Sequence, residues 1–262
     1  MKLIQSELLS QDEICPDIFR IQIKVPEIAG ICQPGQFVHL KVTEGIDPLL
    51  RRPFSIHGAS VEQGTLDLLY RVVGQGSRVM AGMKPGDRWS ILGPLGNGFN
   101  LECDFDHAVI VAGGMGSAPV LFLIEKLLAM KKRITFLWGA RVCDEIFGVK
   151  KLTDAGMDVR IATDDGSRGH HGFVTDLLSE FLKDHAPNDR MLGFVCGPEP
   201  MMAQVQKLAL PTAFPWQVSM ERHMACGVGV CMGCGITMTS GLMQMVCKDG
   251  PIFDLREVDF NG

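Results

Sequence analysis

Four cysteines near the C-terminal end carry the clearest chemical pattern in the sequence. They are spaced C-x4-C-x2-C-x12-C, at Cys226, Cys231, Cys234 and Cys247. A C-x4-C-x2-C run with a distant fourth cysteine is the ligand spacing of a plant-type [2Fe–2S] cluster. The glycines interspersed among them suit a tight loop whose backbone N–H groups can face anionic sulfur. The segment therefore predicts a [2Fe–2S] cluster held by these four thiolates.

A structural zinc site is the alternative that the same residues leave open. Zinc sites usually join two short chelates, whereas here three thiols share one loop and the fourth comes from further along the chain. Cys247 is the least constrained of the four because its gap is short, although it is the only cysteine C-terminal to the loop. The cysteines that stand singly are interpreted as small apolar side chains, namely Cys15, Cys32, Cys103 and Cys143.

The composition narrows the class of protein. With 262 residues, of which 46% are apolar, the chain can bury two ordinary cores and a small extra module. A net charge of -5 and the lack of a long basic run argue against nucleic acid as a partner. No apolar stretch reaches the roughly 18 to 20 residues of a membrane span, and the N-terminal stretch lacks the apolar core of a signal peptide. We therefore expect a cytoplasmic protein with no membrane partner.

Three regions with different patterns follow one another along the chain. Residues 1–102 alternate short β-rich runs with turn signals, which predicts an antiparallel β-barrel. Residues 103–214 alternate apolar strands with amphipathic helices, the pattern of a doubly wound parallel α/β sheet. Residues 215–262 contain one expected strand, WQVSM, and then a Gly- and Cys-rich stretch that cannot bury a core of its own. A metal cluster would supply the missing order in this small C-terminal module.

One run of the expected barrel, LLRRPFSI, combines a cation, a proline, an aromatic ring and a hydroxyl. Successive side chains of a strand point to opposite faces, so Arg52 and Phe54 share one side while Pro53 and Ser55 share the other. This suits FAD laid along the strand, with Arg52 on the pyrophosphate and Ser55 near the ring edge. In LYRVVGQGS, a short helix opens at 76–77, where its amides can take a phosphate. Taken singly, each run is also typical of an ordinary strand or turn.

A Gly-rich turn in the α/β region lies where a dinucleotide would bind. After the strand HAVIVA, Gly114 and Gly116 take the places of the first two glycines of a dinucleotide fingerprint. Pro119 stands at the third place and no acid closes the next strand, so this is not the standard Rossmann pattern. Asp164 and Asp165 follow a later strand, where a carboxylate beside the adenosine ribose would favour NAD over NADP by repulsion. Nearby arginines argue in the opposite direction, which leaves the nucleotide preference open.

The succession RPFS, YRVVGQGS, AGGMGSAP and CGPEPMM resembles the ferredoxin–NADP reductase superfamily of flavin reductases, over about residues 20–215. With the C-terminal cysteines added, the whole chain resembles the electron-transfer subunits of the two-subunit, NAD-dependent (class 1B) dihydroorotate dehydrogenases. The resemblance implies a set of FAD contacts in the barrel: Arg52, Pro53, Phe54, Ser55, Leu69, Tyr70, Arg71, Gly76 and Ser77. Together with the residues above, it gives an expected NAD site of Gly114, Gly116, Pro119, Asp164, Asp165, Cys196, Gly197 and Pro198, with Cys196 close to the nicotinamide.

The resemblance also implies a function. Dihydroorotate would be oxidised at the FMN of a separate catalytic subunit, and electrons would pass through the [2Fe–2S] cluster and FAD of this chain to NAD, in de novo pyrimidine biosynthesis. We expect an oxidoreductase subunit with no catalytic residue of its own, which oxidises dihydroorotate only together with its partner. The cluster loop is expected at the interface of a heterotetramer with two copies of each subunit.

Two other functions stay open. The same arrangement resembles the small subunits of NAD(P)H-dependent ferredoxin or sulfide reductases, in some of which one cluster ligand is not a cysteine. The non-catalytic alternative is a zinc-stapled binding module on a reductase-like fold that has lost its flavin. The full set of cysteines and the intact RPFS and CGP runs favour the dihydroorotate type. The visible absorbance of the purified protein would separate a flavin and iron–sulfur protein from a zinc module.

Overall fold

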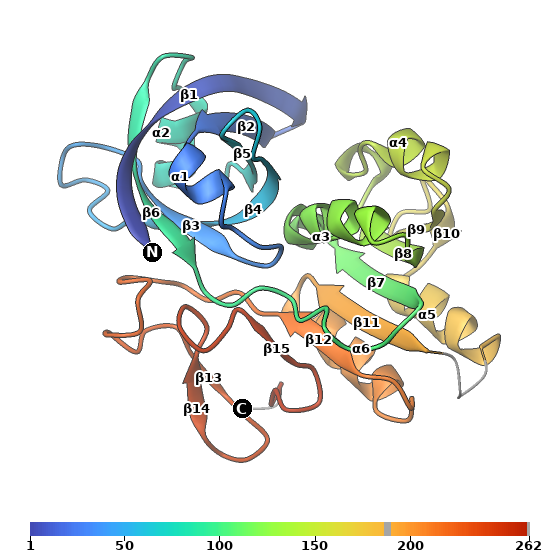
Figure 1. Cartoon of the computed structure of the whole chain (residues 1–262). Helices are drawn as coiled ribbons and strands as arrows, with labels where there is room; N and C mark the ends of the chain where they lie inside the picture. Colours follow the sequence, from blue (N-terminus) through green and yellow to red (C-terminus); the bar gives the residue numbers. More distant parts are fainter. Residues whose placement is uncertain (186–189, 261–262) are drawn as a thin grey trace.

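The chain folds into a β-barrel, a parallel sheet flanked by helices, and a C-terminal segment that touches both (Figure 1). The computed structural model describes residues 1–185 and 190–260. In Figure 1 the barrel runs from blue to blue-green, the helices and strands of the α/β region run from green to orange, and the C-terminal segment is red. This arrangement confirms the predicted fold class of a barrel joined to an α/β domain.

Six antiparallel strands close the barrel in the order β1-β2-β5-β4-β3-β6. Its elements are β1 (Lys2–Cys15), β2 (Ile18–Lys24), α1 (Pro26–Ala29), β3 (Phe37–Lys41), β4 (Arg52–Ser60), β5 (Thr65–Arg71), α2 (Gln75–Ala81) and β6 (Arg88–Leu95). The alternation in FRIQIKV is realised in β2, where Ile21 and Ile23 are buried in the barrel core. Val38 and Leu40 of β3 point into the same core, so Phe37 and His39 belong to its outer face.

The strand β1 was not predicted from the sequence. It is the longest strand of the barrel, yet most of its side chains are exposed or half-buried. Leu8 is fully buried and takes part in the barrel core. Backbone hydrogen bonds to both β2 and β6 hold this polar strand in place. Its sequence has no apolar alternation from which a strand could be predicted.

The second region forms a sheet in the order β10-β9-β8-β7-β11-β12-β15. Its strands and helices in chain order are β7 (His107–Gly113), α3 (Ser117–Ala129), β8 (Arg133–Ala140), α4 (Val149–Asp154), β9 (Asp158–Thr163), β10 (His170–His171), α5 (Val174–Lys183), β11 (Met191–Cys196), α6 (Glu199–Ala209) and β12 (Trp216–Ser219), with the short 3-10 turns Gly114–Gly116 and Cys143–Glu145. Helices α3 and α4 pack on one face through Ile110 and its neighbours, while α5 and α6 pack on the other face through Val109 and Val111. Buried strands covered on both faces explain the continuous apolar runs of the sequence.

The C-terminal segment is joined to the sheet as well as to the barrel. The expected strand WQVSM forms β12, which pairs in parallel with β11, and β15 (Ile252–Asp254) returns antiparallel beside β12. Between them lie the hairpin strands β13 (Gly235–Thr237) and β14 (Met243–Met245). On the barrel side, Asn97 donates its amide to the Asp249 carbonyl at 2.9 Å. The cysteine-bearing segment is therefore fixed on both sides.

Within residues 1–185 and 190–260, no helix is both long enough and apolar enough to cross a membrane.

Candidate functional site

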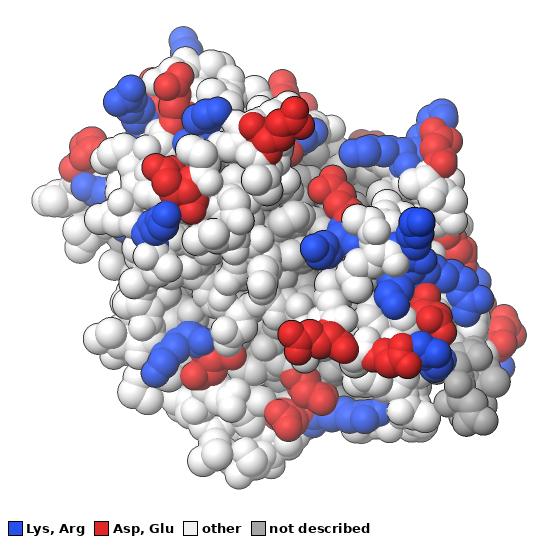
Figure 2. Space-filling model, in the orientation of Figure 1, with Lys and Arg blue, Asp and Glu red and all other residues white. Residues whose placement is uncertain are grey.

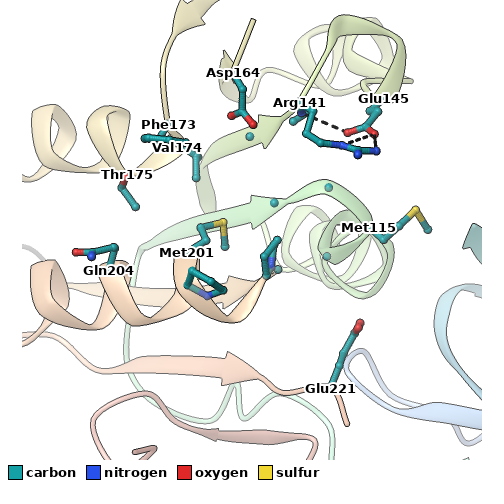
Figure 3. Close-up of a pocket in the computed structure, with 18 of the residues that line it drawn as sticks. Met115, Arg141, Glu145, Asp164, Phe173, Val174, Thr175, Met201, Gln204 and Glu221 are labelled. Carbon is teal, nitrogen blue, oxygen red and sulfur yellow. Dashed lines mark hydrogen bonds and ion pairs between the residues drawn. The ribbon is translucent and has the colours of Figure 1, made fainter. Parts of the chain in front are cut away.

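A cleft of about 620 Å³ opens at the carboxyl ends of the sheet strands (Figure 3). The sheet order runs outward from β7 in both directions, through β8 on one side and β11 on the other. The cleft thus lies at a topological switch point, which is where doubly wound sheets bind their ligands. The predicted nucleotide residues that line it are Gly114, Gly116, Asp164, Gly197 and Pro198.

Two loops meet closely in the floor of this cleft. A Cβ atom on Gly116 would lie 2.3 Å from the carbonyl oxygen of Cys196 and 2.7 Å from the Cα of Gly197. The turn after β7 therefore touches the backbone that follows β11, and only glycine leaves room for that approach. Gly114 needs glycine for a different reason, because its φ is +52° while its surroundings are open. The two predicted glycines shape the nucleotide cleft by different physical means.

Three of the predicted nucleotide residues do not face the cleft. Pro119 is buried in the first turn of α3, where a proline is sterically favourable. The Cys196 side chain is also buried, and burial, with the nearby Glu221 carboxylate, raises the pKa of its thiol. Asp165 turns to Ser167, whose hydroxyl donates to it at 2.6 Å and whose hydrogen bonds lower the pKa of this carboxyl.

An ion-pair network joins the barrel to the mouth of the cleft. Arg71, at the end of β5, donates to Glu145 at 2.8 Å. Arg141, after β8, donates to the same carboxylate oxygen at 2.6 Å, as Figure 3 shows. Burial alone would raise the pKa of Glu145, but the hydrogen bonds from the two arginines outweigh it and lower the pKa. One acidic side chain thereby holds two cations that line the cleft.

Sequence reasoning did not single out Glu145 or Glu221. Glu221 follows β12 and points from below into the cleft in Figure 3. It reaches solvent through the cleft, yet the surrounding chain desolvates it and raises the pKa of its carboxyl. Neither residue belongs to one of the quoted motifs, and their position depends on contacts between regions. The late run WQVSM, which an acid follows directly, is the one local signal for Glu221.

The predicted flavin residues come together on two neighbouring strands and the helix that follows. The RPFS run begins β4, and Leu69, Tyr70 and Arg71 end its neighbour β5. Gly76 and Ser77 lie in the first turn of α2, where a Cβ on Gly76 would be 2.9 Å from Nε of Arg52. The guanidinium of Arg52 therefore lies against the glycine step, a position from which both could face one phosphate.

Some of these flavin residues also have partners within the chain. Phe54 contacts Tyr70 edge to face, with ring centroids 5.8 Å apart, and Tyr70 donates its hydroxyl to Gln11 at 3.3 Å. The Ser77 hydroxyl accepts the backbone N–H of Val73 at 2.9 Å and that of Gly74 at 3.1 Å. Ser77 thus fixes the turn between β5 and α2.

The four predicted cluster ligands lie in one place, as two pairs of thiols. Cys226 contacts Cys231, and Cys234 contacts Cys247. Backbone N–H groups already face these sulfurs, with Gly229 donating to Sγ of Cys247 at 3.1 Å. Burial would raise the pKa of Cys226, but the amides of Val228 and Cys231 outweigh it and lower the pKa to about 6. At Cys247, burial and the neighbouring Cys234 raise the pKa to about 12.

This arrangement fits a binuclear cluster better than a single ion. The thiols form two pairs, Cys226 with Cys231 and Cys234 with Cys247. A structural zinc ion needs four such ligands around one point, whereas two irons take two thiolates each. Gly227 and Gly229 have φ values of +70° and +79°, which turn the loop around the sulfurs. The donor set and the amides suit a [2Fe–2S] cluster.

A barrel with an RPFS strand, a switch-point cleft with a Gly-rich floor, and a four-thiol loop define a flavin-dependent nicotinamide oxidoreductase with a built-in iron–sulfur module. Family models agree, since residues 2–99 match an oxidoreductase FAD-binding domain and residues 110–207 an oxidoreductase NAD-binding domain. Residues 221–259 match the iron–sulfur cluster binding domain of dihydroorotate dehydrogenase B. The chain accordingly has FAD, NAD and iron–sulfur binding domains.

Relatives along the whole chain specify the family. The electron transfer subunit of dihydroorotate dehydrogenase B (NAD(+)) from Desulforamulus reducens is 37% identical over 260 residues, with 98% of each chain covered. The subunit of the same name from Bacillus cereus is 35% identical over 258 residues, with 96% of each covered. The chain belongs to this family of electron transfer subunits.

Solved structures confirm the fold. The structure of an NADH-dependent reduced ferredoxin-NADP oxidoreductase matches with a TM-score of 0.87 and 29% identity, covering 98% of this chain and 90% of that one. A ferredoxin NADP+ reductase from Neisseria gonorrhoeae, with bound FAD and NADP, matches with a TM-score of 0.70 and 20% identity. The match covers 86% of this chain and 96% of that one. The latter likeness concerns the fold alone.

Proposed function

We propose that this chain carries electrons from dihydroorotate oxidation, at the FMN of a catalytic partner subunit, to NAD+. The observation that supports this most directly is the placement of the two ends of such a path around one barrel. The thiol loop packs on the outer face of β3, the neighbour of β4, and the nucleotide cleft receives Arg71 from β5. When bound, the flavin supplies the exchange of single electrons with iron–sulfur and of hydride with nicotinamide.

In this proposal, the residues of the chain bind, orient and shield. Cys226, Cys231, Cys234 and Cys247 hold the [2Fe–2S] cluster. The FAD lies along β4, with Arg52 and Gly76 at its pyrophosphate. NAD enters the cleft over Gly114 and Gly116, and Asp164 faces its ribose. The division into regions 1–102, 103–214 and 215–262 is supported by the ranges that the family models match, although β12 and β15 of the last region complete the sheet of the second.

The surface around the cysteine loop supports a partner on this side. Val230 and Met232, inside the loop, are 79% and 58% exposed, and Leu242 and Met243 of the adjoining hairpin are 66% and 59% exposed. Figure 2 shows that the lower left of the molecule, which the C-terminal segment occupies in Figure 1, carries few charged side chains. Apolar side chains gathered beside a redox centre suit a permanent protein interface. We propose a heterotetramer with two copies of each subunit, and a cytoplasmic location stays a prediction.

Co-expression with the FMN subunit tests the function. The complex is expected to reduce NAD+ when dihydroorotate is added, and to contain FAD and iron. In the variant Cys231→Ser, we expect loss of iron and of dihydroorotate-dependent NAD+ reduction, while oxidation of NADH by an artificial two-electron acceptor persists. Cys103→Ser, at an exposed cysteine outside the loop, is the control and should match the parent complex. Undiminished NAD+ reduction by a Cys231→Ser complex without iron would refute the path through the loop.

The position of the partner is tested separately by mass measurement and limited proteolysis. The complex should have the mass of two copies of each subunit, and the bonds around Val230 should be protected in it. A stable complex in which this loop is cut as fast as in the isolated chain would contradict the proposed interface.

A further inference from the structure

The side chain of His39 lies at the place where the flavin strand and the cysteine loop meet. His39 belongs to β3, and Pro53 of the RPFS strand is its direct neighbour in β4. Side chains directly opposite each other on paired strands share a face, so His39 and Pro53 project to the same outer side of the barrel. The pairing of β3 with β6 shifts register between Phe37 and His39, and such irregularities change the direction of side chains.

The cysteine loop covers this histidine from the other side. A Cβ atom on Gly227 would lie 2.5 Å from Nδ1 of His39 and 2.8 Å from its Cε1. Gly227 directly follows Cys226, so the imidazole touches the backbone next to a predicted cluster ligand. Phe37 lies on one side of the imidazole, with the two ring centroids 6.3 Å apart and the ring planes almost perpendicular. The ring is thus enclosed between the two cofactor-binding segments.

The imidazole has no hydrogen-bond partner although it is completely buried. Its relative exposure is 0%, and in the part of the chain that the structure describes neither Nδ1 nor Nε2 has a polar partner. Burial, helped by the charges of Arg51 and Arg52, lowers the pKa of His39 to about 4. A neutral imidazole has one N–H donor and one acceptor nitrogen, and leaving both unpaired in a dry site is costly.

Packing alone does not account for a histidine here. An apolar ring of the same size would fill the space without two unpaired nitrogens. By contrast, the buried His107 of β7 bonds Thr135 at 2.9 Å. Arg51 also leaves the ring of His39 free, because it donates to the His39 backbone carbonyl and to Ser90. The nitrogen atoms therefore point to an acceptor that the polypeptide does not supply.

We propose that His39 donates its ring N–H directly to a redox cofactor in the seam between β4 and the cysteine loop. This inference rests on the proposed function, which puts a flavin on one side of the seam and a cluster on the other. Both cofactors offer acceptors, namely cluster sulfur and a flavin carbonyl or ring nitrogen. A hydrogen bond to an acceptor that gains negative charge on reduction favours the reduced form. His39 accordingly raises the reduction potential of the cofactor that it contacts.

The test is a redox titration of the intact complex, in which the cluster is followed by electron paramagnetic resonance and the flavin by absorbance. His39→Phe removes the donor and keeps a planar ring, and His39→Gln keeps an N–H donor. Loss of one such bond should change the equilibrium constant for reduction of one cofactor about tenfold, which is about 59 mV for a one-electron couple. His39→Gln should restore most of that shift. His223→Phe, the same change at an exposed histidine three residues before Cys226, should leave both potentials unaltered.

The outcomes separate this inference from the proposed function. A shift of the cluster potential alone in His39→Phe identifies sulfur as the acceptor, and a shift of the flavin potential alone identifies the flavin. If His39→Phe retains full flavin and iron content and both potentials stay at the parent values, the inference is wrong while the proposed function stands. If the reduction potential shifts as far in His39→Gln as in His39→Phe, the shift comes from packing, and the proposed hydrogen bond is refuted.

Discussion

Replacing Gly116 by alanine tests whether the contact between the two floor loops builds the nucleotide site. The φ of Gly116 is -61°, an angle that alanine adopts without strain, so the effect of Gly116→Ala is purely steric. The new methyl group would meet the Cys196 carbonyl carbon and oxygen at 2.5 and 2.3 Å, and both atoms belong to the backbone. Because the methyl lies about 1 Å inside ordinary contact, the turn after β7 must move away from β11.

The size of the effect follows from that displacement. Overpacking by a methyl group costs about 1 to 3 kcal/mol of stability, which for a chain of this size lowers Tm by about 2 to 4 °C per kcal/mol. A shift of about 1 Å in a group that positions a reactant can cost about a hundredfold in rate. We therefore expect NADH-driven flavin reduction to fall by about two orders of magnitude while the protein stays folded at 25 °C.

Gly114→Ala is the matched control two residues away. Its φ of +52° makes alanine costly by about 1 to 2 kcal/mol, but no atom lies within contact of the new methyl group. Stopped-flow reduction by NADH, with Tm measured on the same samples, compares the two variants. Gly116→Ala should lose far more reduction rate than Gly114→Ala at a similar loss of Tm. If Gly116→Ala reduces flavin within threefold of the parent rate, the close approach of the loops does not shape the nucleotide site.

Three further expectations concern the charged residues. Arg52→Ala should weaken FAD binding by about 10- to 100-fold, which is the value of a charge-assisted hydrogen bond. Arg88→Ala, at an exposed position of β6, should leave FAD binding unchanged. The amount of flavin that each variant retains after dialysis measures the difference. Asp164→Asn should raise the ratio of kcat/KM for NADPH over NADH about tenfold, because a carboxylate near a phosphate is repulsive by about 1 kcal/mol or more. Asp165→Asn should change this ratio less, since Ser167 holds the Asp165 side chain. Equal ratios in the parent and in Asp164→Asn would contradict the ribose contact. The pKa of Glu145 is lowered in the folded chain, so its ion pairs stabilise fully above the unfolded pKa of about 4.3 and are lost as pH falls through the lower folded value. The Tm difference between the parent and Glu145→Gln should hold from pH 8 to 6 and shrink below about pH 4.5, and a difference that grows with acid would reverse this assignment.

The sequence predicted those features whose signal is local. The strand β7 and the helix α3 follow from continuous apolar runs and a proline at the first turn, and the thiol loop follows from its spacing. The strand β1 escaped because its support comes from backbone pairing with β2 and β6 rather than from its side chains. Short α4 also lacked an apolar period, since Leu152 is its one buried residue.

The functional residues that sequence reasoning missed depend on distant contacts. Glu145 joins the barrel to the nucleotide cleft because Arg71, from another domain, contacts the same carboxylate as Arg141. His39 reads as an ordinary outward residue of a barrel strand, and no local pattern shows that Gly227 will cover it. Contacts between residues that are far apart along the chain leave no period or spacing in one sequence, so the residues that join the three regions emerge only from the folded structure.

The antiparallel strand β15 has a consequence for biogenesis. It forms one edge of the sheet and covers β12, yet it follows β12 along the chain and is therefore synthesised later. Until it leaves the ribosome, β12 presents unpaired backbone groups, which are a template for pairing with other chains. Because the thiol loop lies between these two strands, its ends are brought together in the same step that seals the sheet. We therefore expect a chain truncated before Ile252 both to aggregate and to contain less iron than the parent chain, which light scattering and iron analysis of the purified proteins would measure.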